Sequence, residues 1–232
     1  MEPVEIPDVG AAYAVARTTC GLALSDGETL AGYKVGLTSA AARAVYGAAE
    51  PASGYVLAST VLAEGDVLPA SRMSAPRAEV ELALLLGEGL RGPGVTPADV
   101  LVATASIAPA FELVASRWTG GAPTLAHLIA DNTNAAYAFV GPPSPVPAGL
   151  SDITCTLTIG TTTVSGSATA VMEGNPAASV AWLANHLAPS GTYLNPGDLI
   201  LTGTLCAPTP FAPGDTLVAD IPGVGSLTLR TE

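Results

Sequence analysis

The sequence predicts an α+β protein built on a curved or rolled mixed sheet, with flanking helices and a short helical N-terminal segment. Three observations favour this fold class. Helix formers in a roughly amphipathic arrangement dominate residues 9–23, whereas β-branched residues between Gly, Pro and Asp dominate from about residue 54. The later helical segments are too few and too unevenly spaced for a regular parallel β-α-β alternation.

The expected elements follow in order along the chain. After the helix at 9–23, residues 29–36 have an apolar strand pattern, and a short helix runs from the N-cap Ser39 to the terminating Gly47. Further strands are expected within 61–71, 76–87, 152–172, 199–204 and 215–231, and helices within 96–104, 122–132 and 176–191. Pro-Gly-Asp sequences at 196–198 and 213–215 each precede a strand, and Pro followed by Gly favours a type II turn.

The composition favours one unit over all 232 residues, with a helical N-terminal part (about 1–50) and a β-rich catalytic core (about 54–232). No stretch resembles a linker or a low-complexity tract. Apolar residues make up 49% of the chain and charged residues 12%. Because so little charge is left to cover an isolated surface, we expect a homo-oligomer.

Charge and residue counts exclude several classes of function. The net charge of −12 repels phosphate backbones and anionic lipids, so we expect neither a nucleic-acid nor a membrane partner. No apolar run is long enough to span a bilayer and the N-terminus lacks a signal-peptide pattern, which predicts a cytoplasmic protein. The three cysteines and two histidines lack metal-ligand spacing, which predicts reduced thiols and no structural zinc.

Two glutamates in an otherwise buried strand are the most informative feature. Glu79 and Glu81 are two residues apart in PRAEVELALLLG, so their side chains share one face about 7 Å apart. At an effective dielectric near 20 their repulsion costs about 2 kcal/mol. Glu112 lies in a second apolar segment, SIAPAFELVASRW. Three such carboxylates form the hard oxygen ligand set that Mg²⁺ or Mn²⁺ prefers; a solvated edge strand is the alternative.

Two further residues are candidates for the same site. Asp131, in IADNTNAAY, is either a site residue or an Asx residue that ends a helix. Lys34 is the only lysine, while the other seven basic residues are arginines, which suggests a need for a compact, titratable ammonium. Its position at the end of a strand, before Gly36, is where pockets form.

These motifs together resemble a known family. The segments GYKVGLTS, PRAEVELALLL, PAFELVASR, ADN, GNPAASVAWLANHLA and LILTGT resemble, in order and spacing, the hydratase and decarboxylase branch of the fumarylacetoacetate hydrolase superfamily. The resemblance implies a β-roll, Mg²⁺ or Mn²⁺ dependence, and a small 2-oxo acid substrate. It also implies metal ligands Glu79, Glu81 and Glu112, the catalytic lysine Lys34, and a substrate-pocket loop that contains Thr202 and Gly203. Arg117 matches an arginine that follows the third ligand in the family, and we expect Arg117 and Asp131 to bind substrate together with that loop.

The implied activity is addition of water to a 2-hydroxydienoate or 2-oxoenoate. One departure weakens this reading, because hydratases of the branch typically have E-P-D-[YF]-G where this chain has Glu50-Pro51-Ala52-Ser53-Gly54. Ala52 cannot transfer a proton. A 2-oxo-diacid decarboxylase of the 4-oxalocrotonate type is therefore the first alternative, and a catalytically impaired homologue acting as a structural or regulatory partner is the second.

Overall fold

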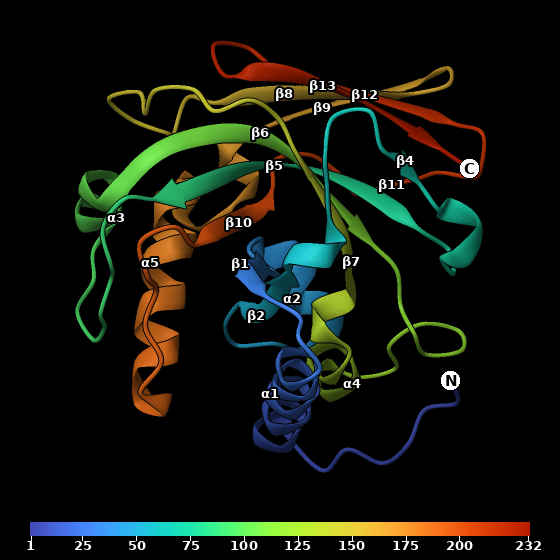
Figure 1. Ribbon diagram of the computed structural model, residues 1–232, viewed down its shortest axis with the longest axis vertical. Coiled ribbons are helices and arrows are strands. Elements are labelled where there is room, and N and C mark those ends of the chain that lie inside the picture. The colour runs from blue at the N-terminus through green and yellow to red at the C-terminus, as the bar shows by residue number, and fades with distance from the viewer.

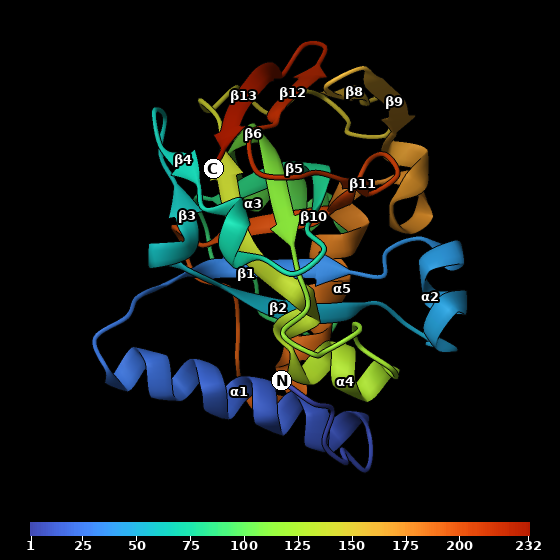
Figure 2. The ribbon, with the colours of Figure 1, turned by 90° about the vertical axis from the view of Figure 1, so that its right-hand side faces the viewer.

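Two mixed β-sheets organise the protein, whose structure, a computed structural model, describes residues 1–232 (Figures 1 and 2). The larger sheet has eight strands in the order β2-β1-β10-β5-β6-β7-β3, with β11 paired to β5; the smaller has the order β4-β13-β12-β8-β9. Only the pairs β1–β10, β3–β7 and β4–β13 are parallel. This is the mixed, rolled arrangement with flanking helices that the sequence predicted.

The strands are β1 (Leu30–Gly36), β2 (Ala52–Leu57), β3 (Val61–Leu62), β4 (Val67–Leu68), β5 (Arg77–Leu86), β6 (Thr104–Val114), β7 (Ala135–Val140), β8 (Thr154–Ile159), β9 (Thr162–Ser167), β10 (Leu199–Thr204), β11 (Thr209–Pro210), β12 (Thr216–Ile221) and β13 (Gly225–Thr231). The helices are α1 (Val9–Ser25), α2 (Ala40–Tyr46), α3 (Pro97–Ala103), α4 (Leu125–Ala130) and α5 (Pro176–Leu187). Each predicted helix corresponds to one of these five, with α1 extending two residues beyond the predicted end at 23. None of the five is long and apolar enough to cross a membrane.

Local signals in the sequence fix the element ends. Every α-helix begins after a side chain that accepts a hydrogen bond from a backbone N–H of the first turn. These caps are Asp8, Ser39, Thr96, Thr124 and Asn175. The two Pro-Gly-Asp turns have φ of +89° and +91° at their glycines, as a type II turn requires at its third residue.

The two faces of the larger sheet differ sharply along β5 and β6. Val80, Leu82 and Leu84 face the main core, which the smaller sheet, α3 and α5 complete. Alternate residues point to the opposite face, where small side chains including Ala83 and Ala110 form a separate cluster. Figure 1 shows the smaller sheet on one side of β5 and β6 and the helices α1 and α4 on the other. The glutamates therefore lie on the face turned away from the main core.

Gly166 lies in β9 directly opposite Cys155 of β8. A Cβ atom at Gly166 would lie 2.0 Å from the Leu205 carbonyl oxygen and 2.7 Å from the Cys206 Cβ. We expect Gly166→Ala to lower the free energy of unfolding by about 1–3 kcal/mol, the usual cost of overpacking. Gly21→Ala, in α1 with open space around it, is the matched control and should stabilise by up to about 1 kcal/mol. Urea unfolding measures both; an unchanged midpoint for Gly166→Ala would contradict this close approach.

Candidate metal centre

Strand register brings the three predicted carboxylates together. Glu79 of β5 is the direct partner of Glu112 of β6, and Glu81 is the partner of Thr204 in β10. Each glutamate offers one carboxylate oxygen such that these atoms all lie within 4.8 Å of one another. Because these residues come from two adjacent strands of one sheet, the cluster has a rigid base.

The environment of these carboxylates fits a divalent cation. Glu81 is 0% exposed and Glu112 is 1% exposed. The Glu81 Oε2 atom accepts a hydrogen bond from the Gly203 N–H at 2.8 Å, but Glu81 Oε1 and Glu112 Oε2 have no hydrogen-bond partner. Orphaned buried carboxylate oxygens are costly unless something positive satisfies them. An all-oxygen donor set of this kind suits a hard divalent ion.

Lys34 supplies one positive charge but not enough for three carboxylates. Its Nζ atom lies 3.0 Å from Glu112 Oε1 and donates to the Thr133 carbonyl oxygen at 3.1 Å. The side chain is buried, which by itself lowers the lysine pKa, but the nearby carboxylates of Glu112, Glu79 and Glu81 outweigh this and raise it. Lys34 is therefore a charged ammonium, and two negative charges of the cluster remain for a dication to neutralise.

Burial and mutual repulsion shift the pKa values of the carboxylates upward. Desolvation is the main cause for Glu79, followed by the charge of Glu112, and together they raise its pKa to about 7. The pKa of Glu81 is raised well above its usual value by burial and by the charges of Glu112 and Glu79. Without a metal, the cluster reduces its repulsion by binding protons.

A cavity of about 1000 Å³ opens onto the cluster. Lys34 and Glu79 are in its wall, with the β1–α2 turn at residues 36–39 and the segment at 203–208 after β10. Gly203 has φ +103°, and a Cβ there would lie 2.5 Å from the Thr38 Oγ1 atom. Only glycine permits this turn to present its N–H to Glu81 while contacting Thr38.

The two predicted residues of the β10 segment have different surroundings. Gly203 lines the cavity, as a substrate-binding residue must. Thr202 is fully buried, and its hydroxyl donates to the Leu82 carbonyl oxygen at 2.9 Å. Thr202 thus fastens β10 to β5, and contact with substrate stays a prediction for both residues.

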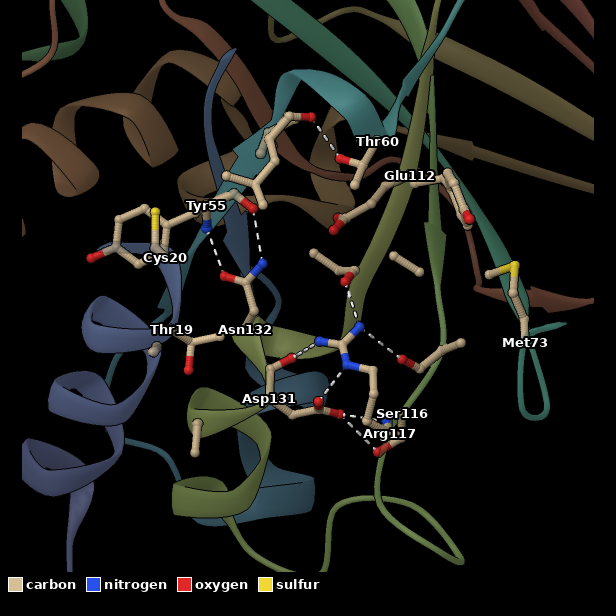
Figure 3. A pocket seen from close by; sticks show the side chains of 18 of the residues that line it. Thr19, Cys20, Tyr55, Thr60, Met73, Glu112, Ser116, Arg117, Asp131 and Asn132 are labelled. Carbon is tan, nitrogen blue, oxygen red and sulfur yellow. Dashed lines mark hydrogen bonds and ion pairs between the residues drawn. The ribbon is translucent and has the colours of Figure 1, made fainter. Parts of the chain in front are cut away.

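Arg117 and Asp131 meet each other rather than the metal cluster. Arg117 Nε donates to Asp131 Oδ1 at 2.6 Å, and Ser116 Oγ donates to Asp131 Oδ2 at 3.0 Å. The guanidinium also donates to the backbone carbonyl of Ala135 at 2.6 Å. Figure 3 shows the pair pointing toward each other in the wall of a second, largely apolar cavity of about 730 Å³.

This pairing favours a positioning role for both residues. Asp131 is the residue at which α4 ends, which is the Asx alternative left open by the sequence. Glu112 is also in the wall of the second cavity, so the cluster separates the two cavities. Substrate binding by Arg117 or Asp131 stays a prediction that these contacts do not support.

The turn that orients Lys34 was not visible in the sequence. Asn132, Thr133 and Asn134 all have φ between +53° and +61°, a left-handed run that is rare for residues other than glycine. The Asn132 side chain holds this turn by accepting from the Tyr55 N–H at 2.7 Å and donating to the Tyr55 carbonyl oxygen at 2.9 Å. The ADN motif at 130–132 marked the position, but nothing in its spacing indicated the conformation.

Two more arrangements depend on the fold. Cys155 and Cys206, distant in sequence, have thiols close enough to hydrogen-bond, and Cys206 lines the metal cavity. All three cysteines are free, as expected. Ala52, at the position of the hydratase aspartate, packs with Ala12 of α1 and Ala126 of α4 rather than lining the metal cavity.

Comparison with known proteins agrees with this geometry. Residues 33–231 match the family described as fumarylacetoacetate (FAA) hydrolase C-terminal. The chain belongs to this family. The matched region contains the three glutamates, Lys34, Arg117, Asp131, Thr202 and Gly203.

Several relatives that are more than 30% identical in sequence to this chain are hydratases. A 2-oxo-hept-4-ene-1,7-dioate hydratase from Escherichia coli is 37% identical over 228 residues, covering 94% of this chain and 85% of the relative. A 2-hydroxyhexa-2,4-dienoate hydratase from Comamonas testosteroni is 34% identical over 224 residues, covering 94% of this chain and 84% of the relative. With relatives of this kind and the intact cluster, the chain is an enzyme rather than an impaired scaffold.

Solved structures of the family share the fold and hold divalent ions. The 4-oxalocrotonate decarboxylase from Pseudomonas putida G7, complexed with magnesium and adipate, superposes with a TM-score of 0.93 at 28% identity, covering 97% of this chain and 86% of the other. A fumarylpyruvate hydrolase from Pseudomonas aeruginosa, in complex with Mn²⁺ and pyruvate, shares the fold with a TM-score of 0.67 at 22% identity, covering 86% of this chain and 88% of the other. The magnesium complex of the decarboxylase supports a divalent-metal site in this chain, for which the three clustered glutamates are the candidates.

Glu81→Gln should separate metal binding from folding. We expect the affinity for Mg²⁺ or Mn²⁺ to fall by at least about 100-fold, because losing even an outer-shell partner costs about 10- to 100-fold. At a pH high enough to ionise the cluster, the metal-free variant should gain about 2 kcal/mol of stability, the repulsion of one neighbouring carboxylate. Calorimetric metal titration and thermal unfolding measure the two effects. Glu88→Gln, at an exposed glutamate, is the control; a metal-free Glu81→Gln protein that melts clearly below wild type would contradict the ligand assignment.

The stability of the metal-free protein should depend on pH in a defined direction. Because the folded-state pKa of Glu79 is raised from 4.5 to about 7, its contribution is fully present below pH 4.5 and is lost as pH rises through 7. Burial lowers the pKa of His186 and acts in the opposite direction, so the comparison is with Glu79→Gln. Between pH 4.5 and 7.5 the wild type should lose stability relative to Glu79→Gln in urea unfolding with a chelator. Parallel pH profiles would refute the raised pKa.

Proposed function

We propose that this enzyme is a lyase that uses Mg²⁺ or Mn²⁺ to add water to a 2-hydroxydienoate or 2-oxoenoate. The observation that carries the proposal is the cluster of the half-buried Glu79 with the buried Glu81 and Glu112. This cluster has orphaned oxygens and a charged Lys34 beside it. These three glutamates would hold the ion. The chemistry that it supplies when bound is Lewis-acid polarisation of a 2-oxo carboxylate.

The chain's own groups have separable roles in that chemistry. The Lys34 ammonium, fixed by Glu112 and by the Thr133 carbonyl, supplies a positive charge and a proton donor where oxyanion character develops on the substrate. The Gly203 N–H holds one oxygen of Glu81, which leaves the other oxygen free to bind the ion. The rigid pairing of β5 with β6 keeps Glu79 and Glu112 in register, so little reorganisation is needed during the reaction.

A second candidate is decarboxylation of a 2-oxo diacid on the same site. Two observations favour it: Ala52 replaces the hydratase aspartate, and the magnesium–adipate complex of the decarboxylase superposes with a TM-score of 0.93. Stabilised enolate character serves both reactions, since loss of a distal carboxylate as CO₂ leaves the same dienolate that hydration begins from. We place hydration first because the relatives at 30–37% identity that cover most of this chain are hydratases.

We also propose that residues 1–232 act as one domain in a cytoplasmic homo-oligomer, with neither nucleic acid nor a membrane as partner. The low content of charged residues supports assembly, as do exposed apolar side chains such as Val45 and Val102, which are 77% and 78% exposed. The net charge of −12 supports the absence of polyanionic partners.

Product analysis tests the reaction. Purified protein is incubated with 2-hydroxypenta-2,4-dienoate or with 2-oxohex-3-enedioate, with and without Mg²⁺ or Mn²⁺, and products are identified by NMR. We expect metal-dependent formation of a 4-hydroxy-2-oxo acid, abolished in Glu81→Gln. Metal-dependent CO₂ release from the second compound, without hydration of the first, would replace the hydratase by the decarboxylase. Inertness toward both would refute the proposed function.

A further inference from the structure

Arg77 carries a positive charge in the metal cavity, where it acts on the nearby Glu79 carboxylate and lowers its pKa slightly but has no hydrogen-bond or ion-pair partner in the protein. It is the first residue of β5 and precedes Glu79 by two positions, so both side chains lie on the cluster face with Cα atoms about 7 Å apart. Arg77 lines the cavity together with Lys34 and Glu79. Its side chain is exposed there and makes no hydrogen bond or ion pair with the protein.

The other basic residues are engaged or lie elsewhere. Arg43 donates to the carbonyl oxygens of Leu37 and Thr38, at 3.0 and 2.8 Å, and so supports the cavity wall from behind. Lys34 and Arg117 are engaged in ion pairs, with Glu112 and Asp131 respectively. Arg91 lies over the Tyr193 ring, and Arg72 lines the second cavity. The last two, Arg17 and Arg230, line neither cavity. Arg77 is therefore the one cation in the wall of the metal cavity that has no hydrogen-bond or ion-pair partner.

The balance of charges in the metal cavity indicates a role for the Arg77 guanidinium in binding an anionic group of the substrate. A dication together with Lys34 would only neutralise the three carboxylates, which leaves no net attraction for a second negative charge on a substrate. In a chain with 20 acidic and 8 basic residues, a substrate with a carboxylate at each end needs its own partner at the distal end. A guanidinium matches a carboxylate with two parallel N–H donors, a geometry that a lysine lacks.

We propose that Arg77 is a specificity-determining residue that binds the distal carboxylate of a 2-oxo diacid, so that the enzyme prefers dicarboxylate substrates over monocarboxylates of equal length. This inference rests on the proposed function, because it assumes that the 2-oxo acid end lies at the glutamates. It applies equally to hydration and to decarboxylation. The named relatives do not decide the point, since one hydratase is named for a 1,7-dioate and another for a hexadienoate with one carboxylate.

Distance supports this assignment. One strand repeat separates Arg77 from Glu79, and the arginine side chain is long enough to place its guanidinium beyond the cluster along the cavity wall. The remaining wall toward β9 is lined by Ser165, Ser167 and Thr169, which are neutral. A chain of six or seven carbons with its 2-oxo end at the cluster therefore meets only one charged group farther along.

The experiment compares two unreactive ligands that differ only at the distal end. Binding of 2-oxoadipate and 2-oxohexanoate to the full-length protein is measured by isothermal titration calorimetry in the presence of Mg²⁺. Both have six carbons and the same 2-oxo acid head, but only the first has a distal carboxylate. We expect wild type to bind 2-oxoadipate roughly ten- to a hundredfold more tightly, the range for a charge-assisted hydrogen-bonded pair.

Variants assign the preference to one side chain. Arg77→Gln should remove most of the preference by weakening 2-oxoadipate binding while leaving 2-oxohexanoate binding unchanged, and Arg77→Lys should retain part of it as a point charge. Arg72→Gln removes a cation from the second cavity and should leave both affinities at the wild-type values. Both arginines are exposed, so unfolding curves should show that the variants fold normally.

Each outcome decides the matter. Equal wild-type affinity for the two ligands, or a preference that survives in Arg77→Gln, would overturn the role of Arg77 while leaving 2-oxo acid binding intact. Failure of wild type to bind either ligand would overturn the proposed function and the assignment of Arg77 with it. A preference lost in Arg77→Gln and kept in Arg72→Gln would establish the assignment.

Discussion

The repulsion among three carboxylates, two of them buried and that of Glu79 half-buried, is the constraint on which this site depends. Glu79, Glu81 and Glu112 lie on adjacent strands with oxygens within 4.8 Å, and burial removes the water that would otherwise screen them. Lys34 offsets one charge, and protons or a divalent cation must offset the rest. Such an arrangement costs stability in the metal-free protein, and metal binding returns that stability to the folded state.

The surrounding structure serves to hold this unfavourable cluster in place. The main core packs against the opposite face of β5 and β6, so the strands cannot twist away to separate the carboxylates. The Gly203 N–H fixes Glu81, and the left-handed turn at 132–134 fixes the carbonyl that orients Lys34. Backbone conformations of this kind persist where neighbouring contacts over-determine them, which is typical of functional sites.

The few basic residues of this acidic chain fall into two groups with different contacts. Lys34 and Arg77 face the metal cavity, whereas Arg43 and Arg117 bind backbone carbonyls and, for Arg117, the Asp131 carboxylate. The first pair is placed to meet a substrate, while the second pair stabilises the walls around it. Arg77 and Arg117 thus have different roles, because the fold supplies hydrogen-bond acceptors for the guanidinium of Arg117 and none for that of Arg77.

The sequence by itself determined the fold class, the five helices with their caps and most of the strands, because these depend on local periodicity and on short-range hydrogen bonds. It also singled out the three glutamates as ionisable residues in apolar segments. The ordered motifs along the chain were sufficient for the family, and the alternation along β5 was sufficient to place Glu79 and Glu81 on one face. Only the tertiary structure showed that Asp131 binds Arg117, that Ala52 is sealed beneath α1, that Cys155 meets Cys206, and that Arg77 has no hydrogen-bond or ion-pair partner. The physical reason is that these contacts join segments far apart in the chain, and the spacing of residues in the sequence does not show which partner a side chain will contact.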